Sequence, residues 1–306
     1  MNRLLAIVGP TAIGKSKLAL RLAQSFNGEI VSADSRQVYR HMDIGTAKPS
    51  PQELSLVPHY LINIVNPDED FSLAQYQHLA YKAIDDIQKR HKLALLVGGS
   101  GLYVWSVLEG WGIPQVPPNL EFRHNLEEKA ARAGTDELYY ELTKVDPVAA
   151  QRIDRRNVRR IIRALEVHRG SKTPFSQLQH KQTPPFNTLI IGLTADRAEL
   201  YRRIDLRVDE MIKQGLVEEV KKLVNMGYDF NLPAMSGIGY KQIGMFLKGD
   251  LTLAAAVQQI KFETHRFVRH QYTWFSLKDD RIKWFDIQSK AEPEIITPLA
   301  KFISGE

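Results

Sequence analysis

The strongest constraint on the fold is a phosphate-binding motif close to the N-terminus. It matches the pattern G-x-x-x-x-G-K-[S/T] and consists of Gly9, Pro10, Thr11, Ala12, Ile13, Gly14, Lys15 and Ser16. An apolar run at 4–8 precedes it and a helical pattern at 15–25 follows it. In this context the backbone N–H groups turn towards an anion, Lys15 adds positive charge, and the Ser16 hydroxyl can ligate Mg²⁺. The motif predicts a P-loop but leaves its phosphate ligand open.

Short apolar runs alternate with helical patterns along the chain. We expect buried strands at 4–8, 29–32, 60–65, 93–97 and 189–193. Helical patterns such as 15–25 and 72–90 lie between them. Such alternation is typical of α/β proteins, in which helices cover both faces of a parallel sheet. The sequence therefore predicts a P-loop NTPase-like core.

Prolines at two places mark out an insertion in this core. They lie in the segments 113–118 and 182–186, and the pattern between them is helical and polar. Because proline ends helices, both segments suit linkers. We expect a core formed by residues 1–112 and 186–306, an all-helical insertion at 113–185, and a C-terminal part that is helical from about Arg197 onwards.

Two polar residues follow expected strands, where open α/β sheets bind ligands. Asp34 comes after the second strand, and its carboxylate could be a catalytic group, a helix N-cap or a ligand of Mg²⁺. Ser100 lies between Gly99 and Gly101 after the fourth strand. Such a turn lets the backbone approach a ligand closely, although an ordinary strand-to-helix turn explains the pattern as well.

Positive charge is concentrated in the expected insertion. The formal net charge of the chain is +6. The basic residues of the segment 151–172 are Arg152, Arg155, Arg156, Arg159, Arg160, Arg163, Arg169 and Lys172. Five of them, at 152, 156, 159, 160 and 163, recur at three and four residues and are expected on one face of a helix. This face predicts contacts to nucleic acid or phosphate; a solvated helix face is the alternative.

Two further basic groups lie in the C-terminal part. The first consists of Lys261, His265, Arg266, Arg269 and His270, followed by Tyr272, Trp274 and Phe275. These aromatic side chains could stack on bases or pack in the core of a C-terminal helix. The second group is Arg203 and Arg207, four residues apart on a helix expected at 197–214. Ion pairs with nearby acidic residues are an alternative to a ligand contact there.

The composition excludes several classes of protein. The chain has no cysteine, so disulfides, thiolate chemistry and cysteine-built zinc sites are excluded. No apolar stretch approaches the ~20 residues that span a bilayer. The expected location is therefore the cytoplasm, without a membrane partner.

At this point the ordered motifs resemble those of the tRNA dimethylallyltransferase family, also called tRNA isopentenyltransferases, over nearly the whole chain. They are the segments 9–16, 34–39, 42–49, 98–103, 159–160, 163–167, 237–241, Gln271 and 273–275. The segment 34–49 is far more specific than the P-loop alone. Two departures are a serine at Ser100, where the family usually has threonine, and His265, where arginine is common.

The resemblance implies transfer of a dimethylallyl group from dimethylallyl diphosphate to the exocyclic amine of the adenine 3′-adjacent to the anticodon, with release of diphosphate. It implies Asp34 as general base, Ser100 as a residue that holds the reacting groups, and Arg207 as an aid to the diphosphate. The P-loop and Mg²⁺ on Ser16 would hold the diphosphate.

The resemblance also implies a tRNA interface. The insertion would grip the anticodon stem-loop, and the target adenine would be flipped out. The implied tRNA-binding residues are Asp34, Ser35, Arg36, Gln37, Ser100, Arg123, Arg159, Arg160, Ile161, Ile162 and Arg163. We expect a monomer. The alternatives are a kinase on the same P-loop, a prenyltransferase acting on free adenine nucleotides, and a non-catalytic RNA-binding protein.

Overall fold

The computed structural model describes residues 2–178, 183, 186–288 and 291–305. The chain forms two compact units. The first unit comprises Met1–Leu108 and Pro185–Glu306, and the second unit comprises Glu109–Pro184. Pro184 and Pro185, on which we based the end of the insertion, lie outside the described residues. Each unit is described by itself below.

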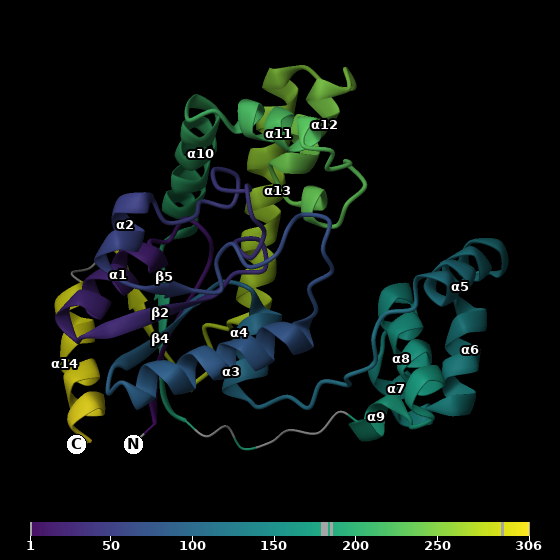
Figure 1. Ribbon diagram of the computed structural model, residues 1–306, viewed down its shortest axis with the longest axis horizontal. Helices are drawn as coiled ribbons and strands as arrows, with labels where there is room; N and C mark the ends of the chain where they lie inside the picture. Colours follow the sequence, from purple (N-terminus) through teal and green to yellow (C-terminus); the bar gives the residue numbers. More distant parts are fainter. Residues whose placement is uncertain (1, 179–182, 184–185, 289–290, 306) are drawn as a thin grey trace. The chain divides into compact units, whose positions relative to one another are not determined.

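A parallel sheet of six strands forms the centre of the first unit, with the order β3-β2-β4-β1-β5-β6. Its strands β2, β4 and β5 are labelled in Figure 1. The strands are β1 (Arg3–Val8), β2 (Gly28–Ala33), β3 (His59–Tyr60), β4 (Leu93–Gly98), β5 (Asn187–Thr194) and β6 (Ile282–Asp286). On β1, Ile7 pairs with Val97 of β4 and with Ile191 of β5. Both β2 and β4 are buried along their whole length, as expected for central strands covered on both faces.

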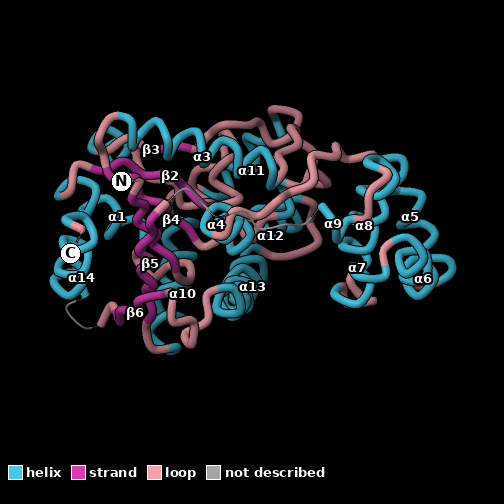
Figure 2. Tube along the Cα trace, turned by 90° about the horizontal axis from the view of Figure 1, so that it is seen from below, coloured by secondary structure: helices cyan, strands magenta, loops and turns pink. Residues whose placement is uncertain are grey.

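Helices cover this sheet on both sides. The helices of the first unit are α1 (Lys15–Ser25), α2 (Pro51–Leu56), α3 (Leu73–Lys89), α4 (Gly101–Leu108), α10 (Arg197–Lys213), α11 (Leu216–Asn225), α12 (Tyr240–Leu247), α13 (Leu253–Trp274) and α14 (Ala291–Ser304), with a short 3₁₀ turn at Ala234–Ser236. Figure 2 shows α1 and α14 on one side of the sheet and α4 and α13 on the other. The predicted α/β architecture with a parallel sheet is confirmed.

Two expectations about the strands were wrong. The strand expected at 60–65 ends at Tyr60, because Leu61 and Asn63 adopt left-handed backbone angles that break an extended strand. Beyond them, Val65 forms only an isolated bridge to Tyr39. The part after Arg197 is not wholly helical, since β6 adds an edge strand parallel to β5. In β6 only Ile282 is buried, so its sequence lacks the continuous apolar run of the central strands.

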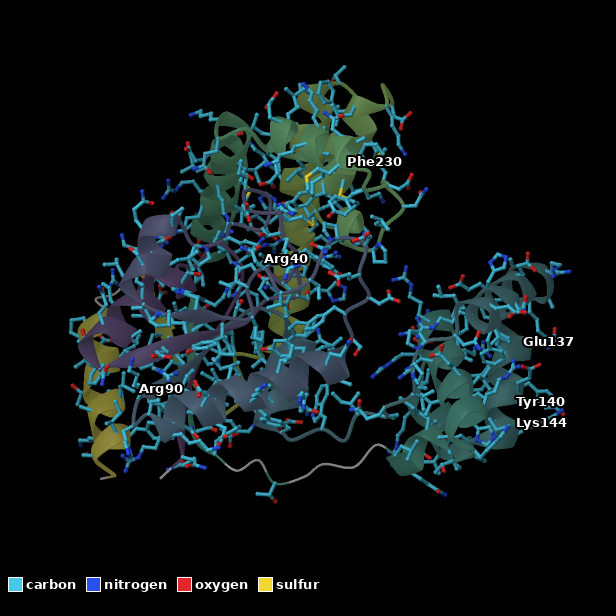
Figure 3. All side chains as sticks on the ribbon, viewed as in Figure 1. Arg40, Arg90, Glu137, Tyr140, Lys144 and Phe230 are labelled. Atoms are coloured by element: carbon cyan, nitrogen blue, oxygen red, sulfur yellow. The ribbon has the colours of Figure 1, made fainter. Side chains whose placement is uncertain are left out.

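A buried carboxylate at the start of β2 binds residues of neighbouring segments in the first unit. Glu29 is 1% exposed and pairs with Arg90 through both oxygens, at 2.6 and 2.7 Å. It also accepts hydrogen bonds from Lys92 and Tyr60. These hydrogen bonds, first of all from Arg90 (labelled in Figure 3), lower the pKa of Glu29 to about 2. The network joins the start of β2 to β3 and to the segment before β4, at the end of the sheet opposite the P-loop.

The second unit is built from short helices joined by turns and loops. Its helices are α5 (Leu120–Ala133), α6 (Thr135–Val145), α7 (Pro147–Arg152), α8 (Val158–Ser171) and α9 (Phe175–Leu178). Its core includes Leu138, Leu142 and Ile161, all fully buried. Asn119, Asp146 and Asn157 cap α5, α7 and α8 with their side chains, which satisfies N–H groups that a helix start leaves unpaired. Within the described residues of the whole chain, no helix is long and apolar enough to cross a membrane.

Candidate active site

The P-loop connects β1 to α1 as the motif predicts. Gly9 has a φ of 137°, and a Cβ there would lie 2.5 Å from the Leu193 carbonyl oxygen of β5, so only glycine fits. Gly14 is the N-cap of α1 with a φ of 101°. Because glycine has no side chain to cap the helix, the first N–H groups of α1 can bind an anion.

Lys15 turns its ammonium group back onto the loop. Its Nζ donates hydrogen bonds to the carbonyl oxygens of Gly9 and Pro10, at 3.0 and 2.7 Å. Burial lowers the pKa of Lys15 to about 7, against an opposing effect of Asp34 and with a further decrease from Arg207. A bound anion would therefore favour the charged form of Lys15.

Arg207 approaches the same loop from α10. Its guanidinium lies 3.4 Å from the Thr11 hydroxyl oxygen, and burial lowers its pKa while Asp34 raises it. Arg203, one turn earlier, pairs with Glu199 at 2.7 Å. Of the two alternatives, Arg203 forms the intrahelical ion pair, whereas Arg207 contacts the P-loop.

Asp34 and Ser100 lie on adjacent turns at the carboxyl ends of β2 and β4. The Asp34 carboxylate accepts the N–H of Arg36 at 2.8 Å. The Ser100 hydroxyl oxygen accepts the N–H of Ser35 at 3.0 Å and donates to the Ser35 hydroxyl at 3.2 Å. The turn that carries Ser100 is therefore bonded directly to the turn that carries Asp34.

The side chains of Arg36 and Gln37 hold loops of the first unit. Arg36 donates to the carbonyl oxygens of Pro233 and Ala234, at 2.8 and 3.3 Å. Gln37 accepts a hydrogen bond from the Ser32 hydroxyl and donates to the carbonyl oxygens of Thr46 and Ala47. Their side chains are thus engaged within the protein.

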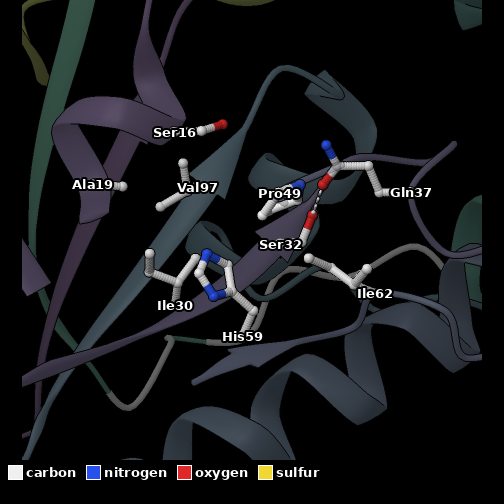
Figure 4. Close-up of a pocket in the computed structure, with 9 residues that line it drawn as sticks. All are labelled: Ser16, Ala19, Ile30, Ser32, Gln37, Pro49, His59, Ile62 and Val97. Atoms are coloured by element: carbon white, nitrogen blue, oxygen red, sulfur yellow. Dashed lines mark hydrogen bonds between the residues drawn. The ribbon is translucent and has the colours of Figure 1, made fainter. Parts of the chain in front are cut away.

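A small pocket lies beside the P-loop between α1 and strands β2 and β4 (Figure 4). It is lined by Ser16, Ala19, Ile30, Ser32, Gln37, Pro49, His59, Ile62 and Val97. Ser16 contributes its hydroxyl, which could ligate a metal. Among the described residues no group of three histidine, cysteine, aspartate or glutamate side chains could hold a metal ion.

Sequence reasoning missed two residues that organise the site. Gln271 of α13 is 4% exposed; its side-chain oxygen accepts the Thr11 N–H at 2.8 Å, and its amide nitrogen donates to the Gly99 carbonyl at 3.0 Å. Gln271 occurs in a motif that carries the resemblance, and this was the only signal for it.

Glu219 of α11 is the second residue. Its carboxylate accepts the N–H groups of Asp43, Ile44 and Gly45, at 2.9, 2.7 and 3.1 Å, and the Tyr240 hydroxyl at 2.6 Å. It therefore holds the loop that follows the Asp34 turn. Glu219 belongs to no motif, so the sequence offered no sign of this contact.

The C-terminal aromatic residues pack mainly inside the protein. Phe275 is fully buried, and the Tyr272 hydroxyl lies 3.0 Å from the Thr194 hydroxyl. Trp274 is 38% exposed and packs on Gly101. His265 lies 2.9 Å from an Asp205 oxygen. Phe275 and Tyr272 therefore pack inside the protein and are not placed to stack on bases.

The expected single face of five arginines was wrong. Arg152 ends α7, α8 begins only at Val158, and Arg156 pairs with Asp154 in the turn between them. Because the chain turns between the two helices, only three of these five arginines, at 159, 160 and 163, share α8.

The residues expected to contact tRNA in α8 and α5 differ in environment. Arg159 and Arg160 are exposed. Arg163 and Arg123 both bind the buried carboxylate of Glu166, at 2.5 and 2.8 Å. Ile161 and Ile162 are 0% and 3% exposed in the core of the second unit. Both are therefore core side chains of the second unit, and the expected tRNA contact at these two positions stays a prediction.

The chain is similar to known proteins over most of its length. A sequence model of the family described as IPP transferase matches residues 37–278. A tRNA dimethylallyltransferase of Dehalococcoides mccartyi is 49% identical over 301 residues, which are 98% of this chain and 93% of that protein. A tRNA dimethylallyltransferase of Chloroflexus aggregans is 54% identical over 275 residues, 90% of this chain and 93% of that protein.

Solved structures show the same likeness. The tRNA isopentenylpyrophosphate transferase of Bacillus halodurans superposes with a TM-score of 0.73 and 40% identity, covering 100% of this chain and 98% of that chain. A eukaryotic dimethylallyltransferase, crystallised acting on tRNA, superposes with a TM-score of 0.86 and 27% identity, covering 99% of this chain and 80% of that chain.

Proposed function

The chain belongs to the IPP transferase family, and we infer that, like its tRNA dimethylallyltransferase relatives, it transfers a dimethylallyl group from dimethylallyl diphosphate to tRNA. The acceptor is the exocyclic amine of the adenine 3′-adjacent to the anticodon. The enzyme is a prenyltransferase that modifies tRNA and releases diphosphate.

The observation that carries the assignment of roles is the convergence of charges at one end of the sheet. Asp34 and Arg207 both change the pKa of Lys15, and the Arg207 guanidinium lies 3.4 Å from the Thr11 hydroxyl of the same P-loop. Two cations and a helix N-terminus suit a diphosphate. A single carboxylate beside them suits the uptake of one proton.

The site would suit Mg²⁺ that is bound together with the substrate. The Ser16 hydroxyl would be a protein ligand, and diphosphate oxygens and waters would supply further ligands, as is usual for Mg²⁺ bound with few protein groups. Bound in this way, Mg²⁺ would help to neutralise the charge of the diphosphate. The protein's own contribution is the position of Ser16 at the first turn of α1.

The reaction forms a bond between the adenine nitrogen and the first carbon of the dimethylallyl group, while the bond from that carbon to the diphosphate oxygen breaks. Asp34 takes the proton that the amine loses. Lys15, Arg207 and the P-loop N–H groups stabilise the charge that develops on the departing diphosphate. The Ser100 hydroxyl holds the Asp34 turn through Ser35.

We propose that the second unit binds the anticodon stem-loop of the tRNA. Arg159 and Arg160 present exposed guanidinium groups on α8, which suit phosphate contacts. Arg163 and Arg123 hold the interior through Glu166 and can support such contacts only indirectly. The target adenine leaves the stack before it reacts. We expect the enzyme to act as a monomer in the cytoplasm.

One assay separates this function from its rivals. The protein is incubated with labelled dimethylallyl diphosphate or with ATP, and with tRNA or AMP, and the products are analysed by mass spectrometry. The proposal requires label on tRNA from dimethylallyl diphosphate without ATP. Phosphate transfer from ATP would support a kinase, and prenylation of AMP alone would support a nucleotide prenyltransferase.

A further inference from the structure

We propose that Gln271 is a positioning residue that holds the P-loop and the turn at 98–101 at a fixed separation, so that the diphosphate and Asp34 stay aligned during transfer. The inference rests on the proposed function. It assigns a role to α13 (Leu253–Trp274), which supplies none of the groups in the reaction described above.

The Gln271 side chain connects two backbone groups through one rigid amide. Its oxygen accepts the Thr11 N–H at 2.8 Å, and its nitrogen donates to the Gly99 carbonyl at 3.0 Å. The side chain is 4% exposed, so water competes little for these hydrogen bonds. Since an amide has its donor and acceptor at a fixed distance, both bonds form only when the two loops are correctly spaced.

The space around Gly99 is adapted to this contact. A Cβ at Gly99 would lie 2.3 Å from the Gln271 amide nitrogen and 3.2 Å from the Gly9 carbonyl oxygen. The backbone of this turn therefore approaches both the amide and the P-loop as closely as it can.

The end of α13 is anchored to the same region by a second residue. A Cβ at Gly101 would lie 2.2 Å from the Trp274 ring, and the indole N–H of Trp105 donates to the Trp274 carbonyl at 2.9 Å. Because α13 is fixed against α4 in this way, the Gln271 side chain can hold the P-loop and the turn at 98–101 at a fixed distance.

The two backbone groups that Gln271 binds are both connected to residues of the proposed reaction. On one side, the Thr11 hydroxyl lies 3.4 Å from the Arg207 guanidinium. On the other side, Ser100 follows Gly99 and bonds to Ser35, which is next to Asp34. Without the two hydrogen bonds of Gln271, the diphosphate site and the base could move relative to each other. Small misplacements of reacting groups cost large factors in rate.

The first test is Gln271→Met, which keeps the volume and removes both hydrogen bonds. We expect kcat for prenyl transfer to fall on the order of 10–10²-fold, while Kd for tRNA stays within about twofold and Kd for dimethylallyl diphosphate changes less than kcat. Ser100→Ala is combined with it in a double-mutant cycle. If the two act through the same turn, their factors in kcat do not multiply.

Two outcomes of this cycle would overturn the proposal. One is an unchanged kcat in Gln271→Met. The other is fully multiplicative factors, which would mean that Gln271 does not act through the turn bearing Ser100. An inactive wild-type enzyme would instead count against the proposed function.

The second test is Gln271→Glu, whose readout is a pH profile. A protonated carboxyl can donate to the Gly99 carbonyl as the amide does, whereas a carboxylate cannot. The ratio of its kcat to the wild-type kcat should therefore rise as pH falls, because the effects of groups that titrate alike in both proteins cancel in the ratio. Gln259→Glu, an exposed position on α13, is the matched control and should give a ratio near one at every pH. A flat ratio for Gln271→Glu would contradict the proposal.

Discussion

At the scale of single residues, charged groups of the candidate site change the pKa of Lys15 and of Arg207. Burial lowers the pKa of Lys15, Asp34 opposes this effect, and Arg207 adds to it. The negative charge of Asp34 raises the pKa of both Lys15 and Arg207 and so opposes the effect of their burial. Substitutions at these residues should separate binding of the diphosphate from the transfer of the proton.

Asp34→Asn should remove transfer while it leaves substrate binding nearly intact. The amide oxygen can still accept the Arg36 N–H, so the turn keeps its geometry, but an amide cannot take the proton of the amine. Loss of a general base typically costs about 10²–10⁴-fold in rate. Single-turnover rates with saturating tRNA test this, with the exposed Asp68→Asn as control. A rate within a few-fold of wild type would remove Asp34 from the chemistry.

Binding of dimethylallyl diphosphate should take up a proton above neutral pH. The pKa of Lys15 is lowered to about 7 in the free protein, so at pH 8 most molecules hold a neutral amine there. The diphosphate restores the ammonium, and binding therefore weakens as pH rises through about 7, by up to tenfold per pH unit.

Titration calorimetry in buffers of different ionisation enthalpy measures that proton uptake directly. Lys15→Met should abolish the uptake and weaken binding. Lys17→Met, an exposed lysine on the same helix, should keep both. Equal proton uptake in the two variants would show that another group is titrating.

At the scale of elements, the sequence predicts local structure well and the surroundings of side chains poorly. The loop at Gly9–Ser16 and α1 follow from residue types and spacing, because phosphate loops depend on local backbone geometry. The arginine stripe was predicted wrongly because the chain turns between α7 and α8. The environment of single arginines depends in addition on tertiary partners. Glu166 is buried, and it draws Arg123 and Arg163 inwards from two helices.

The arginines of α8 should divide into surface and structural residues. Changing Arg159 and Arg160 together to alanine should raise KM for tRNA and flatten the dependence of log affinity on log salt. The slope changes by about 0.7–0.9 for each phosphate that the protein no longer neutralises. KM for dimethylallyl diphosphate and the melting temperature should change little, because both side chains are exposed.

Two comparisons accompany this double variant. Arg163→Ala should lower the melting temperature, because it leaves Glu166 with one cation fewer in a buried site. Arg132→Ala combined with Lys144→Ala removes the same charge from the second unit and should leave the slope nearly unchanged. Lys144 lies over the Tyr140 ring at 4.3 Å on α6 (Figure 3). An equal effect of both double variants would mean that only net charge matters.

At the scale of the whole molecule, contacts between distant parts of the chain build the site. Gln271 reaches Thr11 across 260 residues, and Arg36 reaches Pro233 across 197. Periodicity and motifs identify strands and loops, but they do not state which distant backbone group a side chain will meet. For this reason the strand order and the roles of Gln271 and Glu219 could not be predicted from the sequence, whereas the parallel sheet could.

The division into two units predicts that binding of the two substrates can be separated. All six strands and the P-loop lie in the first unit, and the second unit has its own core around Leu138, Leu142 and Ile161. Replacing Glu109–Pro184 by a flexible linker of about a dozen glycine and serine residues should leave a core that unfolds cooperatively. This core should bind dimethylallyl diphosphate with an affinity within a few-fold of the full chain, because the P-loop, Lys15 and Arg207 are retained.

The same protein should lose prenylation of tRNA by several orders of magnitude if the second unit holds the anticodon stem-loop. The isolated second unit should bind a stem-loop RNA with steep salt dependence, and Arg159→Ala with Arg160→Ala should reduce that dependence. Circular dichroism, calorimetry with dimethylallyl diphosphate and prenylation assays measure the three properties. Transfer to tRNA at near wild-type rates would place RNA binding in the first unit, whereas loss of cooperative folding would mean that the two units stabilise each other.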